Sequence, residues 1–410
     1  MAGEWRDITL GDFVSLQRGH DLTEPDRRPG SIPVVGSAGH NGFHDTALCK
    51  GPGIVVGRSG ASFGQVHFSP VDFWPHNTGL YVTDFKGNDQ RFAFYFLKAL
   101  DFDRYNSGSA QPSLNRNFIY PIPVRIPPVA EQKAIAAVLG ALDDKIELNR
   151  RMNATLEAMA RALFQSWFVD FDPVRAKLDG RKPDGLDKPT AALFPAAFQD
   201  SALGPIPKGW TISPLRELAC YLSRGIGPVY VEEGGMTVLN QKCVRDHRVD
   251  FSKSRLHDTA KKPVDGRTLE PFDVLINSTG VGTLGRVAQI IHLDLKVIVD
   301  SHITIVRASA NVDSRFLGTA LTGLEAEIEA LGEGSTGQTE LSRARLGELK
   351  LVTPPHPIQT AFGEAVGPLL QHIARNDEQS RTLAALRDTL LPKLLSGELA
   401  VPPALGNLKS

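Results

Sequence analysis

The sequence predicts an α+β protein with two similar mixed α/β domains, joined by two long antiparallel coiled-coil helices in a pseudo-two-fold internal repeat. Three observations predict this fold: a repeat of roughly 200 residues, a glycine-rich strand-turn-strand segment in each half, and a heptad pattern closing each half. We expect domain 1 over 1–128, spacer helix 1 over 129–170, a linker over 171–205, domain 2 over 206–355, spacer helix 2 over 356–400 and a tail over 401–410.

The repeat is clearest around the paired prolines that precede each heptad segment. Pro127-Pro128 corresponds to Pro354-Pro355 at an offset of 227 residues. The same offset holds without a gap from Gln111, which matches Gln338, to the end of the heptads. Chance matches do not extend this far, so we interpret the chain as a fused pseudo-dimer.

The front part of each half is typical of a mixed α+β domain. Both parts are rich in Gly, Pro and short β-branched runs, such as 53–56 and 297–306. Each also contains a glycine-rich strand-turn-strand, at 54–66 and at 274–287. We therefore expect several short strands connected by tight turns in each front part.

The back part of each half is predicted to be one long helix, because apolar residues recur there every seven residues. In the first helix the heptad positions are Ile135, Leu142, Asn149, Leu156 and Leu163, with Val138/Leu139, Ile146, Met152, Met159 and Trp167 interleaved. In the second they are Phe362, Leu369, Asn376, Leu383 and Leu390.

One polar residue occupies the middle of each heptad series, Asn149 in the first helix and Asn376 in the second. A buried asparagine costs stability but specifies register, because its amide is left unpaired in any other alignment. Two antiparallel helices would bring the two midpoints together, so we expect Asn149 to face Asn376 and to set the spacer register. Alternatively, each asparagine lies just off the seam and is solvated.

Composition bounds the class of protein. A chain of 410 residues with 41% hydrophobic and 22% charged residues suits two or three globular domains. Its three widely spaced cysteines, Cys49, Cys220 and Cys243, fit a reducing cytoplasm better than a disulfide framework or a zinc ribbon. We find neither a signal peptide nor an apolar stretch long enough for a membrane span, and expect a cytoplasmic location.

The formal net charge of −1 does not by itself indicate a nucleic-acid binder, because neutralisation of phosphates drives most such binding. The charge is uneven, however: residues 241–262 contain seven Lys/Arg against three Asp. This basic run is compatible with DNA, especially if partner subunits add positive charge. The alternative interpretation is a solvated loop.

Motifs of catalytic chemistry are missing from the sequence. There is no P-loop, no H-E-x-x-H and no Cys/His pair at metal-ligand spacing. Pro-Pro occurs at 127, 354 and 402 but never after Asn or Asp, as an amino-methyltransferase loop would require. We therefore expect a chain without catalytic residues and without a metal site.

Four segments closely resemble the specificity subunits of type I restriction-modification systems. They are residues 126–135 (IPPVAEQKAI), 164–171 (FQSWFVDF), 201–210 (SALGPIPKGW) and 390–399 (LLPKLLSGEL). The resemblance covers nearly the whole chain and includes the repeat. The second half departs from it at residues 357–359, where Pro-Ile-Gln replaces the Ala-Glu-Gln of the first half.

The resemblance implies two DNA target recognition domains held apart by an antiparallel helical spacer. It implies double-stranded DNA, two methyltransferase subunits and, for restriction, restriction/translocase subunits as partners, with no membrane. S-adenosylmethionine, ATP and Mg would then be bound by the partner subunits, and no cofactor by this chain. Because the two halves differ in sequence, we expect an asymmetric bipartite target.

Candidate DNA-binding residues are the polar residues of the matched loops, because Arg, Lys, Asn, Gln, Ser and Thr are the side chains that read base edges and bind phosphates. In the first half these are Arg58, Ser59, Ser62, Gln111, Ser113, Asn115 and Arg116. In the second half they are Asn277, Ser278, Thr279, Thr283, Gln338, Thr339, Ser342 and Arg343. Repeated residues can instead serve a shared scaffold, so the non-repeated Lys242, Arg245 and Arg248 are better candidates for phosphate contacts.

The alternative is a tandem coiled-coil assembly adaptor without direct DNA readout. A catalytically complete fused restriction enzyme is disfavoured, because nuclease and methylation motifs are absent.

Overall fold

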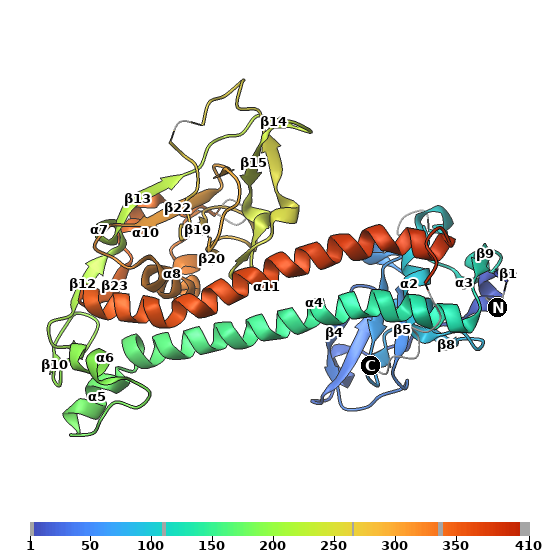
Figure 1. The fold of residues 1–410 in the computed structure, drawn as a ribbon, viewed down its shortest axis with the longest axis horizontal. Helices are drawn as coiled ribbons and strands as arrows, with labels where there is room; N and C mark the ends of the chain where they lie inside the picture. The colour runs from blue at the N-terminus through green and yellow to red at the C-terminus, as the bar shows by residue number, and fades with distance from the viewer. Residues whose placement is uncertain (1–3, 109–111, 265, 335–338, 402–410) are drawn as a thin grey trace. The chain divides into compact units, whose positions relative to one another are not determined.

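The computed structural model describes residues 4–108, 112–264, 266–334 and 339–401. The chain forms two compact units, one made of Met1–Leu148 with Gln379–Ser410 and the other of Asn149–Glu378. Two long helices, α4 (Val129–Phe164) and α11 (His356–Ser396), contribute residues to both units (Figure 1).

The first half of the chain builds three small sheets in unit 1. The largest has strand order β2-β8-β5-β6, the next has order β4-β3-β7, and β1 pairs with β9. The elements are β1 (Arg6–Thr9), α1 (Leu10–Phe13), β2 (Ser15–Arg18), β3 (Ile32–Gly36), β4 (Gly39–His44), β5 (Gly53–Gly57), β6 (Val66–Ser69), β7 (Trp74–Pro75), β8 (Gly79–Asp84), α2 (Gln90–Ala99), α3 (Arg116–Ile119) and β9 (Pro123–Ile126). The central strand β5 is buried along its length and packs in the same core as α2.

The second half builds corresponding sheets in unit 2. The strand orders are β13-β22-β19-β20 and β14-β18-β15-β21, with the pairs β12·β23 and β16·β17 beside them. The elements are β12 (Thr211–Pro214), α7 (Leu215–Leu218), β13 (Ala219–Arg224), β14 (Tyr230–Val231), β15 (Met236–Leu239), β16 (Val244–Arg245), β17 (Arg248–Val249), β18 (Arg255–His257), β19 (Val274–Asn277), β20 (Val287–Gln289), β21 (Val297–Val299), β22 (Ile303–Ala308), α8 (Ser314–Gly323), α9 (Glu325–Ala330), α10 (Arg343–Gly347) and β23 (Lys350–Thr353).

The two halves have the same topology, which confirms the predicted internal repeat. The order β13-β22-β19-β20 repeats β2-β8-β5-β6, and β12·β23 repeats β1·β9. In each half one strand pair of the second sheet is parallel, β3·β7 in the first and β15·β21 in the second. The predicted α+β class with two similar domains and two long helices is therefore correct.

One difference between the halves is the connection that follows β3 in the first half and β15 in the second. Only Ser37 and Ala38 separate β3 from β4, whereas residues 240–254 separate β15 from β18. We call residues 240–254 the insert. It contains the hairpin β16–β17 and most of the basic run noted in the sequence.

Each long helix begins with the same buried glutamine anchor. Gln132 donates from Nε2 to the carbonyl of Pro127 at 3.0 Å and accepts from the Asp89 N–H at 2.9 Å. Gln359 repeats both bonds, its Oε1 accepting from the Asp313 N–H at 3.1 Å. Since Asp89 and Asp313 cap α2 and α8, each glutamine ties the start of a long helix to its own domain.

The two long helices run antiparallel. In unit 2, Asn149 of α4 contacts Asn376 of α11, while Asn153 contacts Ile373. Residue numbers thus rise along one helix as they fall along the other. This is the predicted antiparallel pairing of the two helices.

The seam on α4 differs from the expected pattern at its interleaved positions. Met159, which the sequence pattern placed in the seam, is 48% exposed. Asn153 and Ala160 are buried instead, each one residue beyond a methionine of the predicted pattern. The pattern favoured the methionines because they are the larger apolar residues, but the alternation of three- and four-residue steps continues through Asn153 and Ala160.

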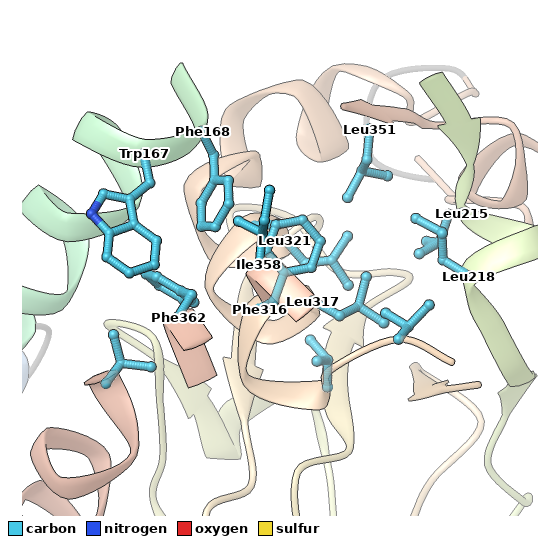
Figure 2. Packing of buried hydrophobic residues seen from close by; sticks show 14 of the residues in the cluster. Trp167, Phe168, Leu215, Leu218, Phe316, Leu317, Leu321, Leu351, Ile358 and Phe362 are labelled. Atoms are coloured by element: carbon cyan, nitrogen blue, oxygen red, sulfur yellow. The ribbon is translucent and has the colours of Figure 1, made fainter. Parts of the chain in front are cut away.

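The segment 171–205 is folded against the core of unit 2. It follows the π-helical turn η4 (Gln165–Val169) and contains α5 (Asp172–Leu178), α6 (Lys188–Leu193) and β10 (Phe198–Gln199), and the next strand β11 (Ile206–Pro207) pairs with β10. In Figure 2, Trp167 and Phe168 lie toward Phe316 and Phe362. The ring of Phe168 is 5.0 Å from that of Phe316 and 5.1 Å from that of Phe362. Such aromatic contacts join η4, the turn that follows α4, to α8 and to the start of α11.

Candidate nucleic-acid interface

A glycine-rich loop follows the central strand of the larger sheet in each half. Glycine loop 1 (58–65) follows β5, and glycine loop 2 (278–286) follows β19. The Gly57 N–H donates to the Gln65 carbonyl at 2.7 Å, and the Asn277 N–H donates to the Arg286 carbonyl at 3.0 Å. The two loops singled out in the sequence are therefore closed by equivalent backbone bonds.

The second matched loop of each half packs against the glycine loop. The Leu114 N–H donates to the Arg58 carbonyl at 2.8 Å, and the Leu341 N–H donates to the Ser278 carbonyl at 2.8 Å. A short β-bridge also joins Ser59 to Ser113. The structure thus brings these candidates together although they are far apart in sequence.

Several candidates hold the scaffold. Asn115 caps α3 by accepting from the Asn117 N–H at 3.0 Å, and Ser342 caps α10 in the same way. The guanidinium of Arg116 donates to the Leu16 carbonyl at 2.9 Å. The two caps explain why a polar capping residue recurs at this position in both halves without any reference to DNA.

Two candidates of the second half do not fit a role in base contact. Asn277 and Ser278 are 0% exposed. Asn277 donates from Nδ2 to the Gln241 carbonyl at 3.0 Å, and the Ser278 hydroxyl bonds that of Thr304 at 2.5 Å. The end of β19 directs both side chains into the protein, where a base edge cannot reach them.

The next residues of glycine loop 2 lie nearer the surface. The Thr279 hydroxyl lies 2.7 Å from His302 Nδ1 and 3.4 Å from Gln241 Oε1. Thr283 donates to the Thr279 carbonyl at 3.4 Å. Both threonines are half-buried and His302 is exposed. Gln241 and His302, neither of which is among the DNA-binding candidates from the sequence, therefore belong to the same polar group.

The three basic candidates of the insert differ from one another. Lys242 and Arg245 are exposed. Arg248 instead lies between the two long helices, with Nη2 2.5 Å from Glu157 Oε1 and Nη1 3.4 Å from Asp377 Oδ1. Two carboxylates already neutralise this guanidinium, so Arg248 does not fit the expected phosphate contact.

The remaining candidates vary in accessibility. Arg343 is exposed, whereas Ser62 and Thr339 are half-buried. Gln111 and Gln338 lie outside the described residues.

The centre of the helix pair in unit 2 is a cluster of three buried asparagines. Asn149, Asn153 and Asn376 are at most 6% exposed. Asn149 donates from Nδ2 to the backbone carbonyl of Asn376 at 3.3 Å. The Asn376 side chain donates to Asn153 Oδ1 at 2.8 Å, and Asn153 is a residue that the heptad pattern had not included.

Two further observations concern the part of the chain that the structure describes. No cluster of three or more His, Cys, Asp or Glu side chains in it could hold a metal ion. No helix within it has the length and apolar character needed to cross a membrane.

Comparison with known proteins agrees with this fold. Residues 2–158 match the type I restriction modification DNA specificity domain. The type I restriction enzyme MjaIX specificity subunit of Methanocaldococcus jannaschii is 26% identical over 321 residues, which are 76% of this chain and 69% of the relative. The HindI specificity subunit of Haemophilus influenzae is 23% identical over 335 residues, 70% of this chain and 71% of that protein.

A solved structure has the same fold. The S subunit of a type I restriction-modification system from M. genitalium superposes with a TM-score of 0.60 at 18% identity, covering 95% of this chain and 96% of that one. The likeness extends over both halves of the chain and both long helices, since it covers nearly all of the two chains. The match over residues 2–158 and the two relatives make this chain similar to the specificity subunits of type I restriction-modification systems.

Proposed function

We propose that this chain is the non-catalytic subunit that selects the DNA target of a type I restriction-modification complex. The observation that carries the proposal is the duplication: one strand order occurs twice, with different side chains in the glycine loops and an insert in the second half alone. Two similar frames with different loops suit two different half-sites on one duplex. The target would then be bipartite and asymmetric.

The paired helices would serve as the spacer between the two reading domains. Helix α4 contains 36 residues, which correspond to roughly 54 Å at about 1.5 Å per residue. Helix length would then decide how many unread base pairs separate the half-sites. In this proposal the buried asparagines, Asn149 and Asn376 among them, specify the register of the spacer.

The complex would supply what this chain lacks. Its net charge of −1 is small for a protein that binds DNA alone, because phosphate neutralisation provides much of the affinity. We propose two methyltransferase subunits as partners, together with restriction/translocase subunits for cleavage. S-adenosylmethionine would be bound by the former, and ATP with Mg by the latter.

The proposal is tested by expressing the chain with its methyltransferase partner and mapping modified adenines by long-read sequencing. We expect one two-part motif with unequal halves, which disappears when the chain is omitted. A complex that assembles but modifies no defined motif, and that shifts duplex DNA without sequence preference, would contradict it. That result would favour the assembly adaptor.

A further inference from the structure

The start of the insert and glycine loop 2 form one polar surface in unit 2. The Gln241 carbonyl accepts from Asn277 Nδ2 at 3.0 Å, and its Oε1 accepts from the Thr279 hydroxyl at 3.4 Å. The Thr279 hydroxyl also bonds His302. Among the described residues, none accepts a hydrogen bond from Gln241 Nε2, and Gln241 is half-buried. Its amide is therefore held at one end and available at the other.

Val281 is the apolar tip of glycine loop 2. Its side chain is 84% exposed, the highest exposure of any large hydrophobic residue that the structure describes. Gly280 and Gly282, with φ of 110° and 69°, flank it. A Cβ added at Gly280 would lie 2.7 Å from Gln241 Oε1, so this turn requires glycine and lies directly against Gln241.

Hydrogen bonds within glycine loop 2 fix the conformation of the turn that carries Val281. The Thr283 N–H donates to the Gly280 carbonyl at 3.1 Å, and Arg286 Nη2 donates to the Gly282 carbonyl at 2.8 Å. Val281 therefore contributes little to the core but occupies a defined position. An exposed apolar side chain on a fixed loop is suited to contact with another molecule.

The first half lacks both features. Ala61 follows Gly60 in glycine loop 1, as Val281 follows Gly280 in glycine loop 2. The residues that replace the insert are Ser37 and Ala38, so no counterpart of Gln241 exists there. Gln241 and Val281 thus occur only in the second half, on a fold that both halves share. Residues that distinguish two half-sites must differ between the halves in this way.

The insert is also anchored at its far end. Arg248 binds Glu157 of α4 and Asp377 of α11, both on the paired helices. This anchor fixes the insert against the helix pair within unit 2, so the position of Gln241 is defined from both ends.

We infer that Gln241 and Val281 together read one A·T base pair in the major groove of the second half-site. A glutamine amide can bond adenine N6 and N7 at once, and an apolar side chain can contact the thymine methyl of the same pair. The inference rests on the proposed function and adds to it the residues that select a base.

The first test uses the unaltered complex of the chain with its methyltransferase partner. Once the motif is mapped, each thymine of the second half-site is replaced in turn by deoxyuridine, which lacks only the methyl group. At one position we expect weaker binding by the wild-type complex, and no such effect of the replacement on V281A. A wild-type complex that is indifferent to deoxyuridine throughout this half-site would overturn the inference.

The second test maps the motifs of variants. Q241A is expected to lose the A·T preference at that position, which corresponds to roughly 5- to 150-fold in affinity. Q241E is expected to favour a C·G pair there, because glutamate accepts from the cytosine amino group. The first half-site should stay unchanged, and the matched controls Gln17→Ala and Val71→Ala, both at exposed positions, should leave the whole motif unchanged.

The outcomes separate the two proposals. If the wild-type chain yields a bipartite motif that Q241A, Q241E and V281A leave unaltered, the inference is wrong and the proposed function stands. If the wild-type chain yields no motif, the proposed function fails first.

Discussion

Asn376 of α11 donates its side-chain amide to Asn153 Oδ1 of α4 at 2.8 Å, and both residues are almost fully buried. We predict that N153L lowers the free energy of unfolding of unit 2 by about 1–3 kcal/mol, because a buried amide loses its acceptor. The double variant N153L/N376L should recover part of this loss. Urea denaturation of the full chain followed by circular dichroism measures both, with M159L at an exposed position as the control. A double variant less stable than N153L alone would contradict this account.

Asn149 and Asn376 are predicted to specify the register of the helix pair. Changing both to leucine removes the contact of Asn149 with Asn376 and the bond of Asn376 to Asn153, and it leaves Asn153 as the remaining asparagine of the cluster. We expect the double variant to populate other registers or other oligomeric states, measured by size-exclusion chromatography with light scattering. A unique monomer with unchanged DNA specificity would leave the asparagines without this role.

Arg248 is predicted to act on structure and Lys242 on DNA. R248M removes a bond to Glu157 and Asp377 and should lower the stability of unit 2, while the salt dependence of DNA binding keeps its slope. K242A should leave stability unchanged and reduce the slope of log affinity against log salt by about 1, the value for one lost phosphate contact. Titrations at several salt concentrations distinguish the two, and R245A is a second test at an exposed position. The reverse pattern would return Arg248 to the interface.

Helix length is predicted to set the gap in the target. Four residues added to each of α4 and α11 lengthen both helices by about one turn, or roughly 6 Å. We expect the unread gap to grow by about one or two base pairs, at about 3.4 Å each, with both half-sites unchanged. Mapping the modified motif measures the gap, and an unchanged gap would contradict the proposed role of the paired helices as the spacer.

Unit 1 is predicted to lose stability at high pH through Tyr95. Its hydroxyl donates to Asp143 at 2.6 Å, and burial, followed by this bond to a carboxylate, raises the pKa of the phenol. The unfolded chain therefore releases the phenol proton first. The contribution of Tyr95 is full below about pH 10 and is lost as pH rises toward the folded pKa. Thermal melts from pH 8 to 11 should show a steeper loss for the wild type than for Y95F, and equal slopes would exclude Tyr95 as the cause.

The sequence predicted the duplication and the two long helices because both leave periodic or repeated residue patterns. The offset that pairs Pro127 with Pro354 showed the duplication, and the heptads showed both long helices. It did not predict that Asn153 lies in the seam, because the neighbouring Met152 is apolar and is therefore the stronger candidate for a buried position. A second asparagine four residues after Asn149 was nevertheless a visible sign of a polar seam.

The candidate site was less accessible to sequence reasoning. Asn277 and Ser278 follow an apolar strand as loop residues do, but their burial depends on partners that are distant in sequence, Gln241 and Thr304. Arg248 has the positive charge that a phosphate contact requires, and only the fold places it beside Glu157. Nothing in the sequence distinguishes Val281, because its exposure depends on the conformation of the folded loop.

Unit 1 is assembled from two separated stretches of chain, with a consequence for the order of folding. Leu394 and Val401 are buried in the same core as Leu10 and Phe13 of the N-terminal domain. During synthesis that core remains incomplete until residues 394–401 have left the ribosome, whereas every residue of the other unit is available by then. A product truncated before Leu394 would expose apolar surface in the N-terminal domain, which is synthesised first. We therefore expect a chain that is defective at its C-terminal end to be recognised for degradation through its N-terminal domain.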